Sequence, residues 1–153
     1  MDPRVPAPKI IDSPNDLAID LYADLLQRLA DLGRASDDPG LSPAMRAFLA
    51  LSWADMWIGN GGFAGLWQGR TATIRGLPDA AALIGAVEFA SLFRDANAAL
   101  PPGALADDDA LAEVDFGPLE AIEGVLTDRY YELDELAEML GDFVIAHPDE
   151  FFS

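Results

Sequence analysis

The stretch that decides the fold is WADMWIGNGGFAGLWQG, residues 53–69, in which glycines and one asparagine interrupt an aromatic-rich pattern. Such a turn can either hold a phosphate group or let two helices meet. It matches neither the P-loop nor the dinucleotide-binding pattern, because it follows a predicted helix and lacks a Lys-Ser or Lys-Thr pair. We therefore interpret it as a tight interhelical corner in which Gly61 or Gly62 supplies a positive φ. Asn60 is expected to cap a helix there, and Phe63 to fill the core.

Two helices are predicted before this corner. Residues 15–33 place a leucine at every third or fourth position on one face, and Gly33 suits the position after the last turn. The second helix begins with Ser42 as N-cap and Pro43 in its first turn, which is a strong start signal. Its apolar and aromatic residues cover most of its circumference. We therefore expect a central, buried helix that Gly59 ends.

The segment after the corner has a less regular pattern. Residues 70–78 are expected to be irregular, with strand as the alternative at residues 71–76. A helix is predicted to begin at Pro78, because proline is favoured in the first turn. Gly85 is expected to divide the following pattern into two helices.

The last third of the chain combines a loop with a long helical pattern. Residues 101–118 are typical of a surface loop, and residues 118–147 show helical spacing with an interruption near Asp134, which favours two helices over one. The chain as a whole is predicted to be all-α, a compact bundle of about six to seven irregularly packed helices. Its expected organisation is a flexible N-terminal segment at residues 1–12 and a single helical domain at residues 13–153.

The charge of the chain is strongly negative and uneven. It has 27 acidic and 9 basic residues, for a net charge of −18 at pH 7. Residues 1–100 carry −4 and residues 101–153 carry −14, with Arg129 as the only base in the second part. This field argues against direct binding to nucleic acid or to an anionic membrane and favours basic protein partners. The alternative is a GC-rich or salt-adapted source, in which acidic, lysine-poor surfaces are ordinary.

The N-terminal sequence predicts the compartment. MDPRVPAPKIIDSP has no apolar segment of the kind found in signal peptides. No stretch approaches eighteen uninterrupted apolar residues, which argues against a membrane span. We therefore expect a cytoplasmic protein.

Residues suited to catalysis or metal binding are few. The chain has no cysteine, and its one histidine, His147, is predicted to interact with the C-terminal end of its helix. The chain therefore has few of the residues that a zinc site or a Ser-His-Asp triad requires. The run Asp107-Asp108-Asp109 lacks the oxygen ligand and the glycine that an EF-hand loop needs next, so a solvated loop is expected. We predict that the protein is not an enzyme and has no catalytic residues, no cofactor and no metal.

Carboxylates in the last third lie at helical spacing. Asp134, Glu138 and Asp142 are four residues apart, as are Asp128 and Glu132, so each series would share one helix face. Such neighbours lie about 5–6 Å apart at Cβ, and duplex DNA carries one phosphate per about 3.4 Å on each strand, so carboxylate rows can resemble a phosphate backbone. The residues predicted to bind a partner as phosphate surrogates are Asp107, Asp108, Asp109, Glu113, Asp128, Glu132, Asp134, Glu135, Glu138 and Asp142.

Three parts of the sequence resemble a known family. The Asn-Gly-Gly-Phe motif at residues 60–63, preceded by Asp55 on an aromatic-rich helix, is similar to the signature of a family of small, acidic, all-helical bacterial proteins. The stretches DAAALIGAVEFASLFRDA and LTDRYYELDELAEMLGDFVIAHPDEF also look similar and follow in the same order. The resemblance covers residues 42–100 and 118–152.

That family is catalogued largely as a domain of unknown function and includes a DNA mimic, an acidic dimer that occupies the DNA-binding surface of a transcription factor. The resemblance implies an all-helical homodimer whose partner is a basic DNA-binding protein. Gly59, Gly65 and Trp57 stand where the family tends to have polar residues, which reduces any polar network there. Function depends on surface sites more than on fold. The alternatives are an immunity or antitoxin-type inhibitor of a basic toxin or nuclease, a carboxylate-dependent enzyme or metal protein, and an acidic helical domain of unrelated role.

Overall fold

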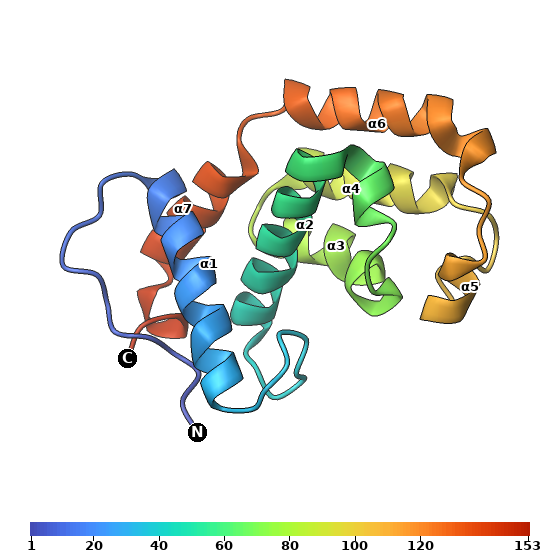
Figure 1. Ribbon diagram of the computed structural model, residues 1–153. Coiled ribbons are helices and arrows are strands. Elements are labelled where there is room, and N and C mark those ends of the chain that lie inside the picture. Colours follow the sequence, from blue (N-terminus) through green and yellow to red (C-terminus); the bar gives the residue numbers. More distant parts are fainter.

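Seven α-helices and no β-sheet make up the protein, as shown by a computed structural model that describes residues 1–153 (Figure 1). The only strand-like pairing is an isolated parallel bridge between Val5 and Phe152. The prediction of a single all-α domain with six to seven helices is confirmed. The elements are α1 (Pro14–Asp31), α2 (Pro43–Leu66), α3 (Thr71–Leu83), α4 (Val87–Ala99), α5 (Asp108–Ala112), the 3-10 turn η1 (Gly117–Leu119), α6 (Glu120–Glu132), α7 (Leu136–Ala146) and the 3-10 turn η2 (Pro148–Glu150).

Helix α2 is the centre of the bundle. Helices α1 and α3 pack against it, α6 lies across α2 and α4, and α7 packs along α1 (Figure 1). One cluster of 36 buried residues connects these helices, so the chain has a single hydrophobic core. The prediction that α2 is buried on nearly all sides is wrong at one face. Met56 and Trp57 are 45% and 40% exposed, because no element covers that side of the helix.

Side-chain caps and glycines set the ends of the first helices as the sequence predicts. Ser42 accepts a hydrogen bond of 3.1 Å from the backbone N–H of Met45, which satisfies one of the donors that a helix start leaves unpaired. Ser13 caps α1 in the same way. Gly33 follows α1 with a φ of 64°, a conformation that favours glycine. The leucine face of α1 is buried against the rest of the bundle.

The region around Pro78 differs from its prediction. Residues 71–83 form one helix, α3, so this segment is neither irregular nor strand, and Pro78 lies inside the helix rather than at its start. A proline has no N–H, so it leaves the carbonyl one turn earlier, that of Ile74, without its helical partner. The side chain of Asn97 on α4 donates a hydrogen bond of 3.1 Å to this carbonyl. The tertiary contact therefore compensates for the proline.

Residues 101–118 pack against the rest of the protein, whereas the sequence predicts a surface loop. It contains the short helix α5, and Ala104 and Leu111 are buried in the core. Asp107 starts this helix by accepting a hydrogen bond of 2.7 Å from the N–H of Ala110. The acidic run is therefore part of a capped helix, which corrects the prediction of a solvated loop.

The long C-terminal pattern forms two helices, as the interruption near Asp134 suggested. Leu133 and Glu135 have extended backbone conformations, so the chain changes direction between α6 and α7 (Figure 1). At the end of α7, Nδ1 of His147 lies 2.9 Å from the carbonyl oxygen of Phe143. This contact confirms the predicted interaction of His147 with the end of its helix.

The two ends of the chain lie together. The N–H of Val5 donates to the carbonyl of Phe151, and the N–H of Ser153 donates to the carbonyl of Val5, each at 3.0 Å. Val5 is buried, with 7% of its surface exposed, whereas Ile10 is 78% exposed. Residues 1–12, predicted to be a flexible segment, therefore contain one stretch that is docked on the C-terminus.

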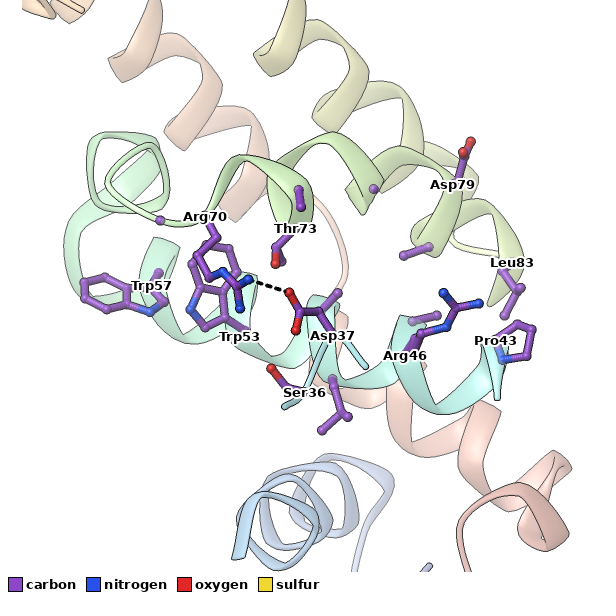
Figure 2. Close-up of a pocket in the computed structure, with 17 residues that line it drawn as sticks. Ser36, Asp37, Pro43, Arg46, Trp53, Trp57, Arg70, Thr73, Asp79 and Leu83 are labelled. Atoms are coloured by element: carbon purple, nitrogen blue, oxygen red, sulfur yellow. Dashed lines mark ion pairs between the residues drawn. The ribbon is translucent and has the colours of Figure 1, made fainter. Parts of the chain in front are cut away.

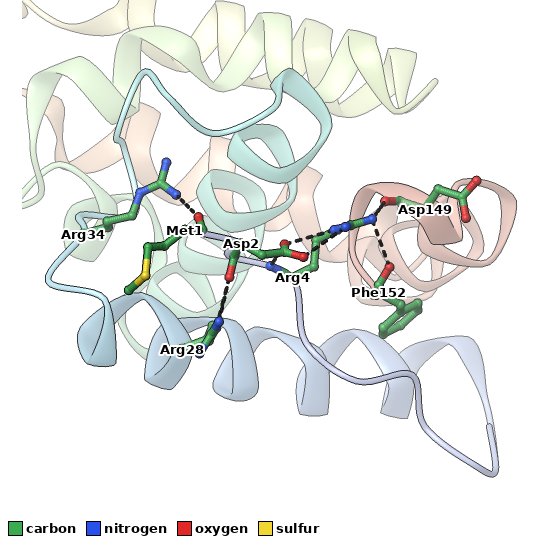
Figure 3. Close-up of polar contacts among 7 residues, drawn as sticks. All are labelled: Met1, Asp2, Arg4, Arg28, Arg34, Asp149 and Phe152. Carbon is green, nitrogen blue, oxygen red and sulfur yellow. Dashed lines mark hydrogen bonds and ion pairs between the residues drawn. The ribbon is translucent and has the colours of Figure 1, made fainter.

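Three arginines hold this docked stretch (Figure 3). Arg28 and Arg34 donate to the backbone carbonyls of Asp2 and Met1. Arg4 forms an ion pair of 2.9 Å with the Asp2 carboxylate, and its hydrogen bonds hold the pKa of Asp2 at about 2. Arg4 also donates to backbone carbonyls near the C-terminus, at Asp149 and Phe152.

None of the helices combines the length and the apolar character that crossing a membrane would require.

Candidate partner-binding surface

The glycine-rich corner is a sharp kink within α2. Gly61 has φ −157° and ψ 17°, and Gly62 has φ 62° and ψ −163°, so neither residue is helical. The predicted positive φ belongs to Gly62 alone. Phe63 is fully buried and packs edge-on against Phe93 and Tyr130, as expected of a residue that fills the core.

Helix α6 supplies the cap of this corner. The N–H of Phe63 donates to Oγ1 of Thr127 at 3.1 Å, and the N–H of Ala64 donates to Oε1 of Glu123 at 3.2 Å. The Thr127 hydroxyl in turn donates to the same Glu123 oxygen at 2.9 Å. Asn60, predicted to cap here, is exposed and its side chain makes no hydrogen bond. The new helix start after the kink is therefore capped from outside its own segment.

Two tyrosines of α6 make further contacts with α2. The hydroxyl of Tyr131 donates to the backbone carbonyl of Ile58 at 3.2 Å, just before the kink. The hydroxyl of Tyr130 donates to the carboxylate of Asp55. Burial raises the pKa of Asp55, with the charge of Glu135 adding to the rise and the Tyr130 hydrogen bond opposing it. Burial also raises the pKa of Tyr130, and the nearby Asp55 charge contributes.

Sequence reasoning missed the role of α6 in this corner. Glu123, Thr127, Tyr130 and Tyr131 are separated by four, three and one positions, which places them on one face of α6. That spacing is the signal that points to a shared contact, although it cannot say with what. The structure shows that the parts of the sequence carrying the family resemblance meet here, because Asp55 and the residue 60–63 motif touch the α6 tyrosines and threonine.

All ten carboxylates predicted to bind a partner are exposed, but two of them have internal roles. Asp107 caps α5. Asp108 accepts hydrogen bonds of 2.8 Å from both the N–H and the hydroxyl of Thr71, which cap the start of α3 and hold the pKa of Asp108 below its usual range. The carboxylates that make no hydrogen bond or ion pair within the protein are Asp109, Glu113, Asp128, Glu132, Asp134, Glu135, Glu138 and Asp142.

The predicted carboxylate rows are shorter than the spacing implied. Asp134 and Glu135 lie in the link between α6 and α7, so Asp134 does not continue the row on α7. Glu138 and Asp142 remain as an i,i+4 pair on α7, and a second such pair lies on α6. The spacing argument fails at the link because helical periodicity holds only within one helix. Asp134 and Glu135 instead border a cavity of about 360 Å³ beside Asp55.

The helices that carry these residues follow one another along the outside of the molecule. In Figure 1, α5, α6 and α7 form an arc around α2 and α4. Arg129 is the only base in this part of the chain, and it is paired with Asp95 of α4 at 3.0 Å. No group of three or more His, Asp or Glu side chains is arranged to hold a metal ion. The exposed carboxylates of the arc therefore have neither an internal cation nor a metal site to neutralise them.

Comparison with known proteins gives one match. A family model described as DMP19-like protein matches residues 39–147, which is more than half of the chain. The matched region includes the kink of α2, all of α6 and all of α7. No curated protein and no solved structure matches the chain.

Proposed function

The chain belongs to the DMP19-like family, whose namesake is a DNA mimic, and from this we propose that it is a non-enzymatic DNA mimic. In this proposal its exposed carboxylates occupy the basic surface of a DNA-binding protein such as a transcription regulator. The homodimer that the family resemblance implies stays a prediction.

The observation that carries the proposal is the set of eight exposed carboxylates without an internal partner on α5, α6, α7 and the link between them. A surface carboxylate that accepts hydrogen bonds within its own protein is less available to a new cation, because those bonds already engage one of its oxygens. Asp107 and Asp108 are in that position, so we assign them to the fold and remove them from the binding surface. The other eight are available to arginines and lysines that normally contact phosphates.

Electrostatic mimicry of this kind has a measurable signature. A protein that binds DNA releases counterions, so its affinity falls steeply with salt. Binding to a carboxylate surface is also screened, over a distance of about 8–10 Å at physiological ionic strength. The partner should therefore bind this protein best at low salt, and duplex DNA should compete for the same surface.

The test uses a charge-reversed pair on α7. Glu138→Lys with Asp142→Lys changes the net charge by the same amount as Asp79→Lys with Glu88→Lys, two exposed residues on α3 and α4. Each protein is immobilised and exposed to lysate at low salt, and bound proteins are eluted with duplex DNA. The partner recovered by wild type is then titrated against all three proteins. We expect the α7 variant to bind about tenfold or more weakly and the α3–α4 variant to remain close to wild type.

Three outcomes contradict the proposal. In the first, duplex DNA elutes nothing; in the second, both variants weaken binding equally; in the third, the recovered partner keeps its affinity for the α7 variant. Circular dichroism of each variant shows whether the helices are intact. A recovered nuclease or toxin that duplex DNA displaces would instead indicate the inhibitor function.

A further inference from the structure

A groove of about 620 Å³ lies between α2 and α3 (Figure 2). Its lining comes from α2, α3 and the segments before them, which hold none of the ten carboxylates discussed above. The volume falls within the range of about 300–1,000 Å³ that is typical of small-molecule sites. Ala72, Gly76 and Ala80 form much of the α3 wall, so small side chains leave the space open.

Two indoles form one end of this groove. Trp53 and Trp57 are one turn apart on α2, with ring centroids 6.4 Å apart and planes inclined by 52°. The place of Trp53 depends on Gly69, since a Cβ at Gly69 would lie 2.3 Å from the indole ring. Trp57 is 40% exposed although it is a large aromatic residue. The two rings offer a planar ligand a surface for offset or edge-on packing.

The charge of the groove differs from that of the rest of the molecule. Its charged lining residues are two arginines and two aspartates, so its formal charge is zero in a chain of net charge −18. Arg70 is paired with Asp37 at 2.9 Å (Figure 2). The side chain of Arg46 makes no hydrogen bond or ion pair with the protein and lies toward the opposite end from Trp57 in Figure 2. The groove therefore joins an aromatic surface to one uncompensated cation.

We propose that this groove binds a small planar aromatic carboxylate, with its ring against Trp53 and its carboxylate on Arg46. The guanidinium of arginine suits a carboxylate because its N–H groups can bind both oxygens. A small ligand with one negative charge fits better than an acidic protein segment, since repulsion from the −18 field increases with each added charge. The same repulsion disfavours a second copy of this chain in the groove.

The test follows the indole N–H signals of the three tryptophans in ¹H–¹⁵N NMR spectra, assigned with single Trp→Phe variants. The probe is 1-naphthoate, and the neutral amide 1-naphthamide is its uncharged analogue. We expect naphthoate to shift the signals of Trp53 and Trp57 and to leave that of Trp67 in place, because Trp67 is only 1% exposed. The amide should bind about tenfold more weakly, since it lacks the charge-assisted contact.

Arginine variants assign the charge contact. Arg46→Gln should weaken naphthoate binding about tenfold and bring it to the level of the amide. Arg94→Gln is the matched control, because Arg94 is an exposed arginine on α4, outside the groove, whose side chain also makes no hydrogen bond or ion pair. It should bind naphthoate as wild type does. The α7 variant of the preceding section should also bind normally, so that this proposal and the DNA-mimic proposal fail separately.

Several results overturn the inference. The inference fails if naphthoate shifts no indole signal at millimolar concentration, or if naphthoate and naphthamide bind equally well. Equal loss of binding in the two arginine variants would show general charge attraction rather than a site. Indole shifts that follow protein concentration without any probe would show that a second copy fills the groove.

Discussion

Gly62 is the residue on which the corner depends most directly. Its φ of 62° with ψ of −163° lies in a region that is essentially restricted to glycine, and a Cβ there would lie 2.6 Å from Glu123 and 2.8 Å from Thr127. Gly62→Ala should therefore lower the free energy of unfolding by about 2–3 kcal/mol, from backbone strain and loss of the cap. Urea denaturation followed by circular dichroism measures this change.

The neighbouring glycine provides the control. Gly61 has a φ of −157°, and a Cβ there would have no atom within 4 Å, so Gly61→Ala should change stability by less than about 0.5 kcal/mol. The sequence left open which of the two glycines has the positive φ, whereas the structure assigns it to Gly62. Equal destabilisation by the two substitutions would contradict the assignment of the strained position to Gly62.

Asp55 gives a pH-dependent prediction. Because its pKa is raised in the folded protein, folding favours the protonated carboxyl, and stability falls as pH rises from the unfolded value of 3.8 through the folded pKa. Asp55→Asn removes this cost while an amide oxygen still accepts the Tyr130 hydrogen bond. The variant should therefore have a higher Tm than wild type at pH 7, and the difference should shrink toward pH 4.

Asp128 provides the control for Asp55, because it is a carboxylate that is not buried. Asp128→Asn on α6 takes away one exposed, unpaired negative charge. If it raises Tm at pH 7 as much as Asp55→Asn does, the effect comes from the net charge of the molecule and the role of Asp55 is misassigned. Thermal melts of both variants and wild type at pH 4 and pH 7 make the comparison.

At the scale of elements, α6 joins the parts of the bundle. It caps the second half of α2, contacts the first half through Tyr131 and pairs with α4 through Arg129. Periodicity predicted that this segment is helical and that it breaks near Asp134. The pattern did not predict its contacts, and Ile122, four residues before the buried Leu126, is 39% exposed. Helix α6 contacts its neighbours largely through polar side chains, so its apolar pattern is weak. Residue spacing alone therefore does not predict how α6 packs.

The same limit explains the error in α3. Proline inside a helix is unfavourable by about 3 kcal/mol or more, so a sequence argument places it at a helix start. Here Asn97 satisfies the carbonyl that the proline leaves unpaired, and Asp108 caps the helix seven residues earlier, at Thr71. Both partners come from other elements. The helix boundary was therefore set by contacts that are distant in the sequence.

At the scale of the whole molecule, the docked N-terminus closes the bundle against its C-terminus. Val5 is buried and forms backbone hydrogen bonds with Phe151 and Ser153, whereas Ile10 is exposed. Val5→Ala should lower the free energy of unfolding by about 1–2 kcal/mol, because it removes buried apolar surface. Ile10→Ala should stay within about 0.5 kcal/mol of wild type. Equal and small effects in denaturant titrations would show that the whole of residues 1–12 is flexible, as the sequence predicted.

The sequence by itself determined the all-α fold, the cap at Ser42, the break between α6 and α7 and the kink at residues 60–63. These features follow from spacing and backbone preference within a few residues, so they can be derived from neighbouring positions. Only the tertiary structure decided that Thr127 and Glu123 cap the kink, that Asp107 and Asp108 belong to the fold, and that eight other carboxylates stay free. It also decided that Arg46 and two indoles share one groove. Such contacts join residues far apart in the chain, and their partners are fixed by the packing of whole helices rather than by local pattern.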